Sequence, residues 1–385
     1  MLPKTADVLI IGGGVIGASI AYYLARRKVR VVLLEKGELA GGTSGACDGL
    51  VFLQSKKPGV HLELALTSQK LFQELDRQLP VPIHYQNKGG LIVVESEEEQ
   101  EAMQAHVQNC RSNGLEVSLL DRRDLLQMEP HLSPELFGAA YSPLDSQVNP
   151  ISLAQGLALG ARDFGAQILT WTEVLDIECT GAKIEAVKTS HGRIQTRTVV
   201  NAAGIWAPAV ARMAGIDLPI SPRRGQILVT EPLPLLLGKC LLSARYIGAK
   251  YKPGLQSGTG GGVSMEQTES GNLLLGSTRE FVGFDCRTTL SGLKGIAGAC
   301  SRIIPALQDV LAIRSFAGLR PYTPDGLPIL GRVPDKPGFI LAAGHEGDGI
   351  ALAPVTGLLI AQLITDGATD ISLEAFNCGR FGKGD

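Results

Sequence analysis

The sequence lacks an excess of either charge. Its 385 residues include 36 lysines and arginines and 38 aspartates and glutamates, which gives a formal net charge of −2. Proteins that hold nucleic acid by its phosphates carry a basic patch or stripe, and no such stripe occurs in this chain. The charge balance therefore argues against nucleic-acid binding.

The cysteines lack the pattern of a disulfide framework or a zinc site. There are seven, widely spread, and no C-x-x-C pair occurs among them. An odd, dispersed set of this kind fits a reducing compartment. We expect a cytoplasmic protein without a bound metal, which would associate with a membrane only peripherally, through partners.

The chain also lacks internal repeats, low-complexity linkers and a membrane anchor. Residues 8–25 are a run of 18 residues without a charge, followed by Arg26, Arg27 and Lys28. The basic cluster lies on the wrong side for a signal peptide, and four glycines interrupt the run. We interpret it as a buried strand leading into a helix, and we expect no transmembrane segment.

Glycine is abundant instead, with 47 residues, and three of them form a recognisable turn. Residues 7–11 and 29–34 predict two buried strands, with a helix between them that ends at about residue 27. Gly12-x-Gly14-x-x-Gly17 joins the first strand to the helix. Glycines at this spacing permit a tight turn, close approach of the backbone to a pyrophosphate and close helix packing. The helix N-terminus attracts phosphates.

Glu35 and the loop after it extend this pattern. Glu35 ends the second strand 18 positions after Gly17, where its carboxylate can accept hydrogen bonds from ribose hydroxyls. The small-residue loop 41–46 can pass close to an extended cofactor, and Thr43 and Ser44 supply hydroxyl donors. We predict dinucleotide binding. The alternatives are an ordinary glycine-rich turn and a flexible surface loop.

The rest of the chain alternates helices and strands. We predict helices at 62–79, from 96 onward, at 150–164 and at 350–365, and strands at 89–94, 167–171, 173–177, 198–203, 226–230, 272–277 and 310–316. The β-α-β start and the strand-rich segment 221–320 do not divide at one boundary. We therefore expect two domains that are interleaved along the chain.

Seven motifs follow one another along the chain. They are the glycine fingerprint, the E-K-x(4)-G-G-T-S loop, Val200-Asn-Ala-Ala-Gly-Ile-Trp206, Arg224-Gly-Gln-Ile-Leu-Val-Thr230, Gly318-Leu-Arg-Pro321, Thr323-Pro-Asp-Gly326 and Gly344-His345 through Gly349-Ile350. In this order they resemble the FAD-dependent amine and amino-acid oxidoreductases, the family of glycine oxidase, sarcosine oxidase and D-amino-acid oxidase. They extend from residue 7 to about residue 365, so the resemblance covers nearly the whole chain.

Three further segments resemble one branch of that family more closely. They are Cys47-Asp-Gly49 with Gln54-Ser-Lys-Lys-Pro58, the stretch 271–283, and Gly344-His-Glu-Gly-Asp-Gly349. Similar segments occur in the FAD-carrying β subunits of multi-subunit dehydrogenases that act on proline, hydroxyproline or opines, and in a hydrogen cyanide synthase subunit. The resemblance implies partner subunits that carry a second flavin or an iron–sulfur cluster. No cluster-binding cysteine spacing occurs in this chain, so any cluster would belong to a partner.

The resemblance also implies the fold. We expect an α/β protein with a doubly wound, Rossmann-like FAD-binding domain, interleaved with an α+β substrate domain built on a mixed β-sheet. Residues 1–80, 145–220 and 320–385 would form the first domain, and residues 81–144 and 221–319 the second.

The implied reaction is FAD-dependent oxidation of the C–N bond of an amino acid, by hydride transfer to flavin N5, which gives an imine. Secondary or cyclic amines such as proline, hydroxyproline or an opine are favoured, and glycine, sarcosine and D-amino acids are also considered. One alternative is oxidation of a 2-hydroxy acid or polyol by the same fold. Another is an assembly or electron-relay subunit without its own activity.

Arg320 matches the family's carboxylate-binding arginine, and its planar, bidentate guanidinium suits a carboxylate. A structural ion pair is the alternative role. His345 precedes a turn whose N–H groups could stabilise negative charge on the flavin, and it contacts either substrate or cofactor or simply the backbone. Tyr246 and Tyr251 are candidates to close the substrate pocket, or ordinary half-exposed aromatics. No cysteine lies near Arg320, which favours non-covalent FAD.

These inferences give a full set of expected site residues. Arg320 and His345 are the expected catalytic residues, and Arg320, Tyr246, Tyr251 and His345 are expected to bind substrate. The expected cofactor-binding residues are Gly12, Gly14, Val15, Ile16, Gly17, Glu35, Lys36, Gly42, Thr43, Ser44, Ala46, Cys47, Val174, Ala202, Ala203, Gly204, Trp206, Gly318, Arg320, Gly347, Asp348, Gly349 and Ile350. For Asp348, capping of the last helix is the alternative.

Overall fold

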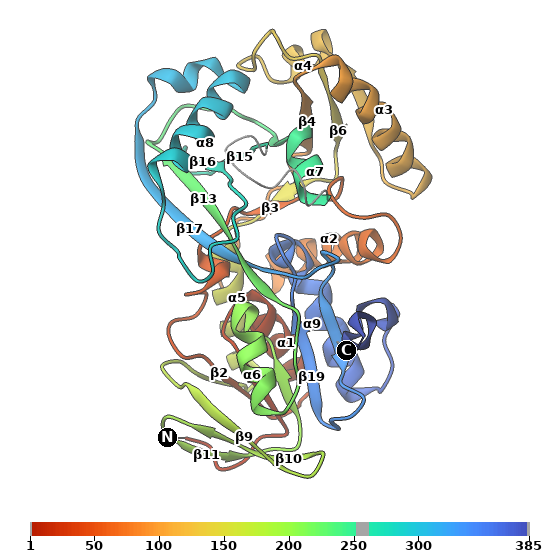
Figure 1. Ribbon diagram of the computed structural model, residues 1–385, viewed down its shortest axis with the longest axis vertical. Coiled ribbons are helices and arrows are strands. Elements are labelled where there is room, and N and C mark those ends of the chain that lie inside the picture. Colours follow the sequence, from red (N-terminus) through yellow and green to blue (C-terminus); the bar gives the residue numbers. More distant parts are fainter. Residues whose placement is uncertain (1, 252–261, 383–385) are drawn as a thin grey trace.

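The computed structural model describes residues 2–251 and 262–382, and a six-stranded sheet forms the centre of its lower half in Figure 1. The strands are β1 (Val8–Ile11), β2 (Val31–Leu34), β8 (Gln167–Leu169), β12 (Val199–Asn201), β18 (Ile329–Arg332) and β19 (Phe339–Ala343), in the order β18-β19-β12-β1-β2-β8. Neighbouring strands are parallel except for the β18–β19 pair. Each strand comes from one of the three segments assigned to the cofactor domain.

Apolar residues on both faces of this sheet explain why it is buried. In β1, Val8 and Ile10 pack on one side with α1 (Val15–Arg26), α5 (Pro150–Asp163) and α9 (Gly349–Thr365). Leu9 and Ile11 pack on the other side with α6 (Ala207–Met213) and a three-stranded sheet. That sheet is formed by β9 (Val174–Thr180), β10 (Lys183–Thr189) and β11 (Gly192–Gln195). Alternate residues of a strand point to opposite faces, so a fully buried strand has to be apolar throughout.

A second sheet, of eight strands, lies in the upper half of Figure 1. Its strands are β4 (Gly90–Val94), β5 (Ser118–Asp121), β6 (Gly138–Ser142), β13 (Ser221–Thr230), β14 (Cys240–Ser243), β15 (Ser264–Gln267), β16 (Leu273–Gly276) and β17 (Ala312–Tyr322), in the order β17-β13-β16-β15-β14-β4-β6-β5. Only the β14–β4 pair is parallel, so the sheet is mixed, as predicted. The helices α3 (Glu97–Ser112), α4 (Arg122–Met128), α7 (Ala244–Tyr251) and α8 (Leu290–Ile303) lie in the same half.

The long strands β13 and β17 connect the two halves, and they run side by side in antiparallel register. The expected boundary between residues 319 and 320 falls inside β17. The strand therefore carries Gly318 and Arg320 from the eight-stranded sheet onto the end of the six-stranded one. There it contacts the 3-10 helices η1 (Thr43–Gly45) and η2 (Gly204–Trp206).

The remaining elements complete the connections. α2 (Val60–Gln78) packs on α9, and β3 (Leu50–Val51) pairs with β7 (Ser146–Gln147). The predicted helix from residue 96 is α3, and Ser96 caps it by accepting a hydrogen bond from the Glu99 N–H. No helix in the described part of the chain is long and apolar enough to cross a membrane, and the charge-free run 8–25 is divided between β1 and α1.

Candidate functional site

A cavity of about 800 Å³ lies where β17 crosses the carboxyl end of the six-stranded sheet. Open α/β sheets bind their ligands at this end of the strands. Most of the residues expected at the site line the cavity, although they come from seven separate stretches of the sequence. These lining residues are Gly12, Gly14, Val15, Ile16, Glu35, Lys36, Gly42, Thr43, Ser44, Ala46, Cys47, Val174, Ala202, Ala203, Gly204, Trp206, Tyr246, Gly318, Arg320, His345, Gly347, Gly349 and Ile350.

The glycine turn between β1 and α1 has the geometry that its spacing predicts. Gly12 has a φ of +115°, and a Cβ at this position would lie 2.5 Å from the carbonyl oxygen of Ala202. A Cβ at Gly17 would lie 1.9 Å from the carbonyl oxygen of Gly12. Gly17 does not line the cavity: its contribution is to let α1 pack against the turn. The N-terminus of α1 begins at the cavity wall, which suits a phosphate.

Glu35 connects this turn to the loop that follows β2. Its Oε2 accepts a hydrogen bond from the Gly13 N–H at 2.7 Å, and its Oε1 accepts one from the Gly37 N–H at 2.8 Å. A carboxylate oxygen can accept more than one hydrogen bond. Glu35 therefore holds two loops together and still has acceptor capacity facing the cavity.

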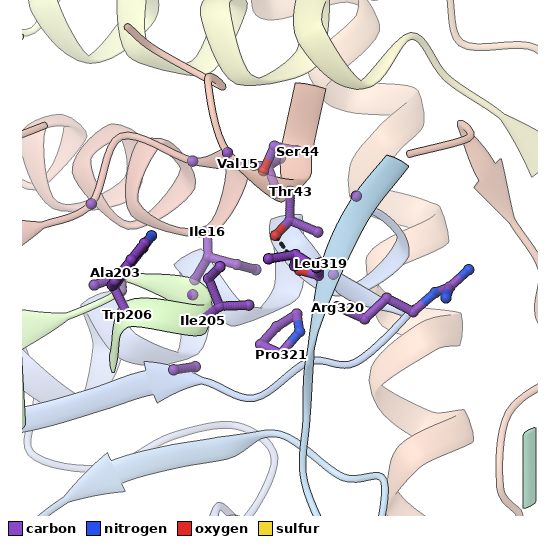
Figure 2. Close-up of a pocket in the computed structure, with 18 of the residues that line it drawn as sticks. Val15, Ile16, Thr43, Ser44, Ala203, Ile205, Trp206, Leu319, Arg320 and Pro321 are labelled. Carbon is purple, nitrogen blue, oxygen red and sulfur yellow. Dashed lines mark hydrogen bonds between the residues drawn. The ribbon is translucent and has the colours of Figure 1, made fainter. Parts of the chain in front are cut away.

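The hydroxyls of Thr43 and Ser44 fix the second loop. Ser44 Oγ accepts a hydrogen bond from the Val15 N–H at 3.0 Å, and Thr43 Oγ1 donates one to the Leu319 carbonyl at 2.6 Å (Figure 2). Thr43 thus uses its proton on β17, whereas Ser44 keeps its proton for a ligand. A Cβ at Gly318 would lie 2.1 Å from the Ala46 carbonyl oxygen, so the strand and the loop are in direct backbone contact.

An aromatic wall closes one end of the cavity. Trp206 stacks on Phe284 with ring centroids 4.6 Å apart, and Lys36 Nζ lies 3.7 Å from the centroid of the Trp206 ring. In Figure 2, Ala203 and Trp206 lie at one end of the row of labelled residues and Arg320 lies at the other. The cavity is therefore elongated, with an aromatic end and a cationic end.

Arg320 is held from one side at the cationic end. Among the described residues, it donates to the Thr278 carbonyl at 3.0 Å through Nη1 and to Ser277 Oγ at 2.6 Å through Nη2. A guanidinium has five N–H donors, so further donors are available to a ligand. The guanidinium extends over Gly225 on β13, where a Cβ would be 2.4 Å from its nitrogens.

A buried ion pair lies next to this end. Arg223, which faces Arg320 across the β13–β17 pair, is hydrogen-bonded to Glu346, and both side chains are buried. Burial lowers the pKa of Arg223, and the charge of Glu346 opposes that shift. The pair ties β13 to the turn before α9, so it fixes the position of this turn at the cavity.

His345 lines the cavity as a buried, neutral imidazole. Its Nε2 lies 3.1 Å from Thr356 Oγ1 on α9. Burial lowers the pKa of His345 to about 4, because desolvation disfavours the charged form. One of its ring nitrogens is thus already engaged by the helix that follows.

Asp348 does not face the cavity, contrary to the expectation for this residue. Its carboxylate pairs with Lys56 at 2.8 Å and with His61 at 3.5 Å, and all three side chains are buried. Asp348 occupies the N-cap position of α9, yet its side chain makes no capping hydrogen bond. The carboxylate instead lies between Lys56 and His61 of α2, contacts that the sequence around Asp348 does not indicate.

One of the two candidate tyrosines, Tyr246, is found at the cavity. The guanidinium carbon of Arg279 lies 3.9 Å from the centroid of its ring. Tyr251 is the last residue of α7, and its side chain lies outside the described part of the chain.

Asp48 is a charged cavity residue that the sequence analysis did not predict. It lines the cavity and is partly accessible, and its Oδ2 accepts a hydrogen bond from Ser264 Oγ at 3.1 Å. The Cys47-Asp-Gly49 segment could have drawn attention to it. Its side-chain hydrogen-bond partner could not, because Ser264 lies on β15, 216 positions away.

Together these features fit an extended dinucleotide. The turn at Gly12 is a backbone cradle that a Cβ would obstruct, and the N-terminus of α1 begins at the cavity wall. Trp206 and Arg320 lie at opposite ends of the row of labelled residues in Figure 2, which leaves the phosphate-binding turn between an aromatic and a cationic end.

Comparisons with known proteins agree with this geometry. A family model described as FAD dependent oxidoreductase matches residues 7–363. The chain is 34% identical over 384 residues to a glycine oxidase of Geobacillus kaustophilus, covering 97% of each protein. It is 31% identical over 420 residues to the hydrogen cyanide synthase subunit HcnC of Pseudomonas aeruginosa, covering 98% of this chain and 97% of the relative. The crystal structure of L-proline dehydrogenase from P. horikoshii aligns with a TM-score of 0.91 and 28% identity over 100% of both chains.

These matches confirm the predicted resemblance, the α/β fold and FAD as the cofactor. They also confirm the predicted class of enzyme, which oxidises C–N bonds of amino acids or amines. One of the relatives is named as a subunit of a larger enzyme.

Proposed function

Because this chain belongs to the FAD-dependent oxidoreductase family, we propose that it oxidises the C–N bond of an amino acid whose carboxylate binds Arg320. The observation that carries this proposal is the position of Arg320. Its guanidinium is anchored by Ser277 and Thr278 at the end of the cavity opposite Trp206. A planar cation with unused donors suits the carboxylate of an amino acid.

The residues around the glycine turn would hold FAD. The backbone N–H groups at the start of α1 would bind the pyrophosphate, Glu35 the ribose, and Lys36 and Trp206 the adenosine end. Bound FAD supplies the acceptor for the hydride that leaves Cα. No cysteine occurs within 30 residues of Arg320 on its C-terminal side, which is consistent with a non-covalent cofactor.

The chain's own contribution is positioning and charge. Arg320 would fix the carboxylate so that one Cα–H points along the cavity toward the cofactor, and such positioning supplies much of the rate of an enzyme. Gly347, Gly349 and Ile350 line the cavity at the start of α9, a helix of 17 residues. Its N-terminal N–H groups carry a positive partial charge, which would stabilise negative charge that develops nearby.

Among amino acids we favour a secondary or cyclic amine such as proline, hydroxyproline or an opine. The similarity to L-proline dehydrogenase along the whole chain supports this choice. Glycine and sarcosine come next, because the chain is also 34% identical to a glycine oxidase. We also propose that the chain works with partner subunits, since its relative HcnC is named as a subunit.

Anaerobic flavin absorption tests the proposed function. The purified, FAD-loaded protein is titrated with D- and L-proline, hydroxyprolines, glycine, sarcosine and opines, and with 2-hydroxy acids as the comparison series. Loss of the oxidised flavin band with an amine, but not with the matching hydroxy acid, supports the proposal. Reduction by hydroxy acids alone would contradict it, and so would a protein that does not bind FAD.

A second experiment tests Arg320. Arg320→Lys keeps the positive charge and loses the planar pair of donors, so we expect a higher KM for the amino acid and unchanged FAD content. Equal kcat/KM in the variant and the wild type would remove Arg320 from the site.

A further inference from the structure

Two carboxyl groups meet at the cationic end of the cavity, and the function proposed above leaves both unused. Asp48 lines the cavity. Glu266 on β15 is buried behind it, with its Oε1 accepting a hydrogen bond from the Gly49 N–H at 2.9 Å. The other oxygen, Oε2, is buried and has no hydrogen-bond partner among the described residues. Buried carboxyl oxygens rarely lack a partner without a functional reason.

The two carboxyl groups differ in what opposes the effect of burial on them. Burial, and then the charge of Asp48, raises the pKa of Glu266 to about 8, so Glu266 is mostly protonated at neutral pH. Burial also raises the pKa of Asp48, but the charge of Arg320 and the Ser264 hydrogen bond oppose that shift. Two adjacent buried carboxyl groups do not both ionise readily. Arg320 and the Ser264 hydrogen bond favour the ionised form of Asp48, so the charge is assigned to Asp48, the partner that faces the cavity.

Asp48 and Arg320 influence each other without forming an ion pair. The charge of Arg320 lowers the pKa of Asp48, yet no salt bridge joins the two side chains, both of which belong to the described residues. Both line the same cavity. A negative and a positive group that face one space without direct contact match the two charged ends of a zwitterion.

We propose that Asp48 binds the substrate's ammonium group and accepts its proton, while Arg320 holds the carboxylate. This inference rests on the proposed function and adds a base to it. One N–H bond of the ammonium breaks and the proton passes to a carboxylate oxygen of Asp48. The freed lone pair on nitrogen then forms the C=N bond as the Cα–H leaves as hydride to bound FAD, the oxidant. Glu266 is a positioning residue, which keeps its proton and holds the loop through Gly49.

The proposal predicts a preference for amines over hydroxy acids. A hydroxy acid has a carboxylate for Arg320 but no cation for Asp48, so it would leave a buried charge unpaired. Hydrogen bonds to charged groups contribute more than neutral ones. We expect an amino acid to bind about 10- to 100-fold more tightly than an analogue without the ionisable nitrogen.

Binding to the reduced holoenzyme tests the proposal apart from activity. The FAD-loaded protein is reduced with dithionite, so that ligands bind without turnover. Anaerobic calorimetry then compares L-proline with tetrahydrofuran-2-carboxylate, and glycine with acetate. Wild type should prefer the amino acid in each pair. Asp48→Asn should reduce that preference to within about threefold without weakening the binding of tetrahydrofuran-2-carboxylate or acetate, the two ligands that lack nitrogen. Asp163→Asn, at the exposed end of α5, is the matched control.

The pH profile separates a charge effect from a structural one. Proline binding to the wild type should weaken as the pH falls through the pKa of Asp48, whose ionisable neighbours are Glu266, Arg320, Arg279 and Cys47. Ser264→Ala removes the hydrogen bond that lowers this pKa, so it should move the acid limb to higher pH. This second variant leaves Asp48 in place and serves if Asp48→Asn fails to fold.

Three outcomes would overturn the proposal. Wild type could bind each amino acid and its nitrogen-free partner with equal affinity, or Asp48→Asn could keep the full preference for the amino acids. The third is a pH dependence of proline binding that Ser264→Ala leaves unchanged. Any of these, in a protein whose flavin is still reduced by an amino acid, would remove Asp48 and leave the proposed function standing. A protein whose flavin no amine reduces would contradict the proposed function itself.

Discussion

Replacement of Gly225 by alanine tests whether Arg320 positions the substrate. A Cβ at Gly225 would lie 2.4 Å from Nη1 and Nη2 of Arg320 and 2.5 Å from Cζ, whereas ordinary contacts begin near 3.4 Å. The guanidinium must therefore move by about 1 Å. Because it is the end of a flexible side chain, the move costs the fold little. A displacement of this size in a positioning group lowers the rate by roughly 100-fold, or about 2.7 kcal/mol in the transition state.

We expect Gly225→Ala to bind FAD normally, to melt within a few degrees of wild type and to lose about 100-fold in kcat/KM. Gly298→Ala is the control, because a Cβ at that helical position meets nothing within 4 Å. It should keep full activity and gain roughly 0.4–1 kcal/mol of stability. Steady-state kinetics and thermal denaturation measure both. Activity of Gly225→Ala within threefold of wild type would refute the inference that Arg320 positions the substrate.

Three further predictions concern stability and the cofactor. The pKa of His345, about 4 in the fold against 6.5 in the unfolded chain, means that its contribution to stability is lost between pH 6.5 and 4, by about 3 kcal/mol. The free energies of unfolding of wild type and His345→Gln, measured by denaturant titration, should approach each other as the pH falls through that range. A difference that stays constant with pH would contradict this. The pKa of Glu266, about 8, is raised, so wild type loses stability as pH rises from about 4.5 to 8. Glu266→Gln should be the more stable protein at pH 8 and differ little at pH 4.5, and a constant gap would rule this out. Gly17→Ala puts a Cβ 1.9 Å from the Gly12 carbonyl oxygen, so we expect a loss of about 1–3 kcal/mol in stability and reduced flavin content, measured by thermal shift and flavin absorbance; normal flavin content would argue against a role for Gly17 in the cradle.

Sequence reasoning predicted the part of the site that is local in the chain. The turn at Gly12 and the acid at Glu35 belong to one β-α-β unit of about 30 residues. The residue types alone indicate these two features. Gly12 adopts a φ of +115°, which favours glycine, and Glu35 places a carboxylate at the end of a strand. The predicted helices and strands also largely coincide with those observed, because apolar periodicity follows burial directly.

The part that the sequence did not reveal depends on contacts across the chain. Asp348 follows a glycine at the start of an apolar helix, and that pattern suggests a cap; the pairing with Lys56, from a segment nearly 300 positions earlier, decides otherwise. The approach of Glu266 to Gly49 joins β15 to a loop 217 positions away. Neither partner carries a local signal, since a buried charge is stabilised by whatever opposite charge or donor the fold brings to it.

The cofactor-binding and substrate-binding residues lie on different sheets, so substitutions should affect the affinities for FAD and for substrate differently. The cofactor cradle belongs to the six-stranded sheet and its own loops, whereas Arg320, Ser264 and Glu266 are carried by strands of the eight-stranded sheet. Substitutions at the substrate end therefore alter groups that the cradle does not use. Distant sites with no shared partners act independently, so substrate affinity and FAD affinity should change separately. Thr43 is one exception, because its hydroxyl donates a hydrogen bond to the Leu319 carbonyl next to Arg320, and its loss should weaken both affinities.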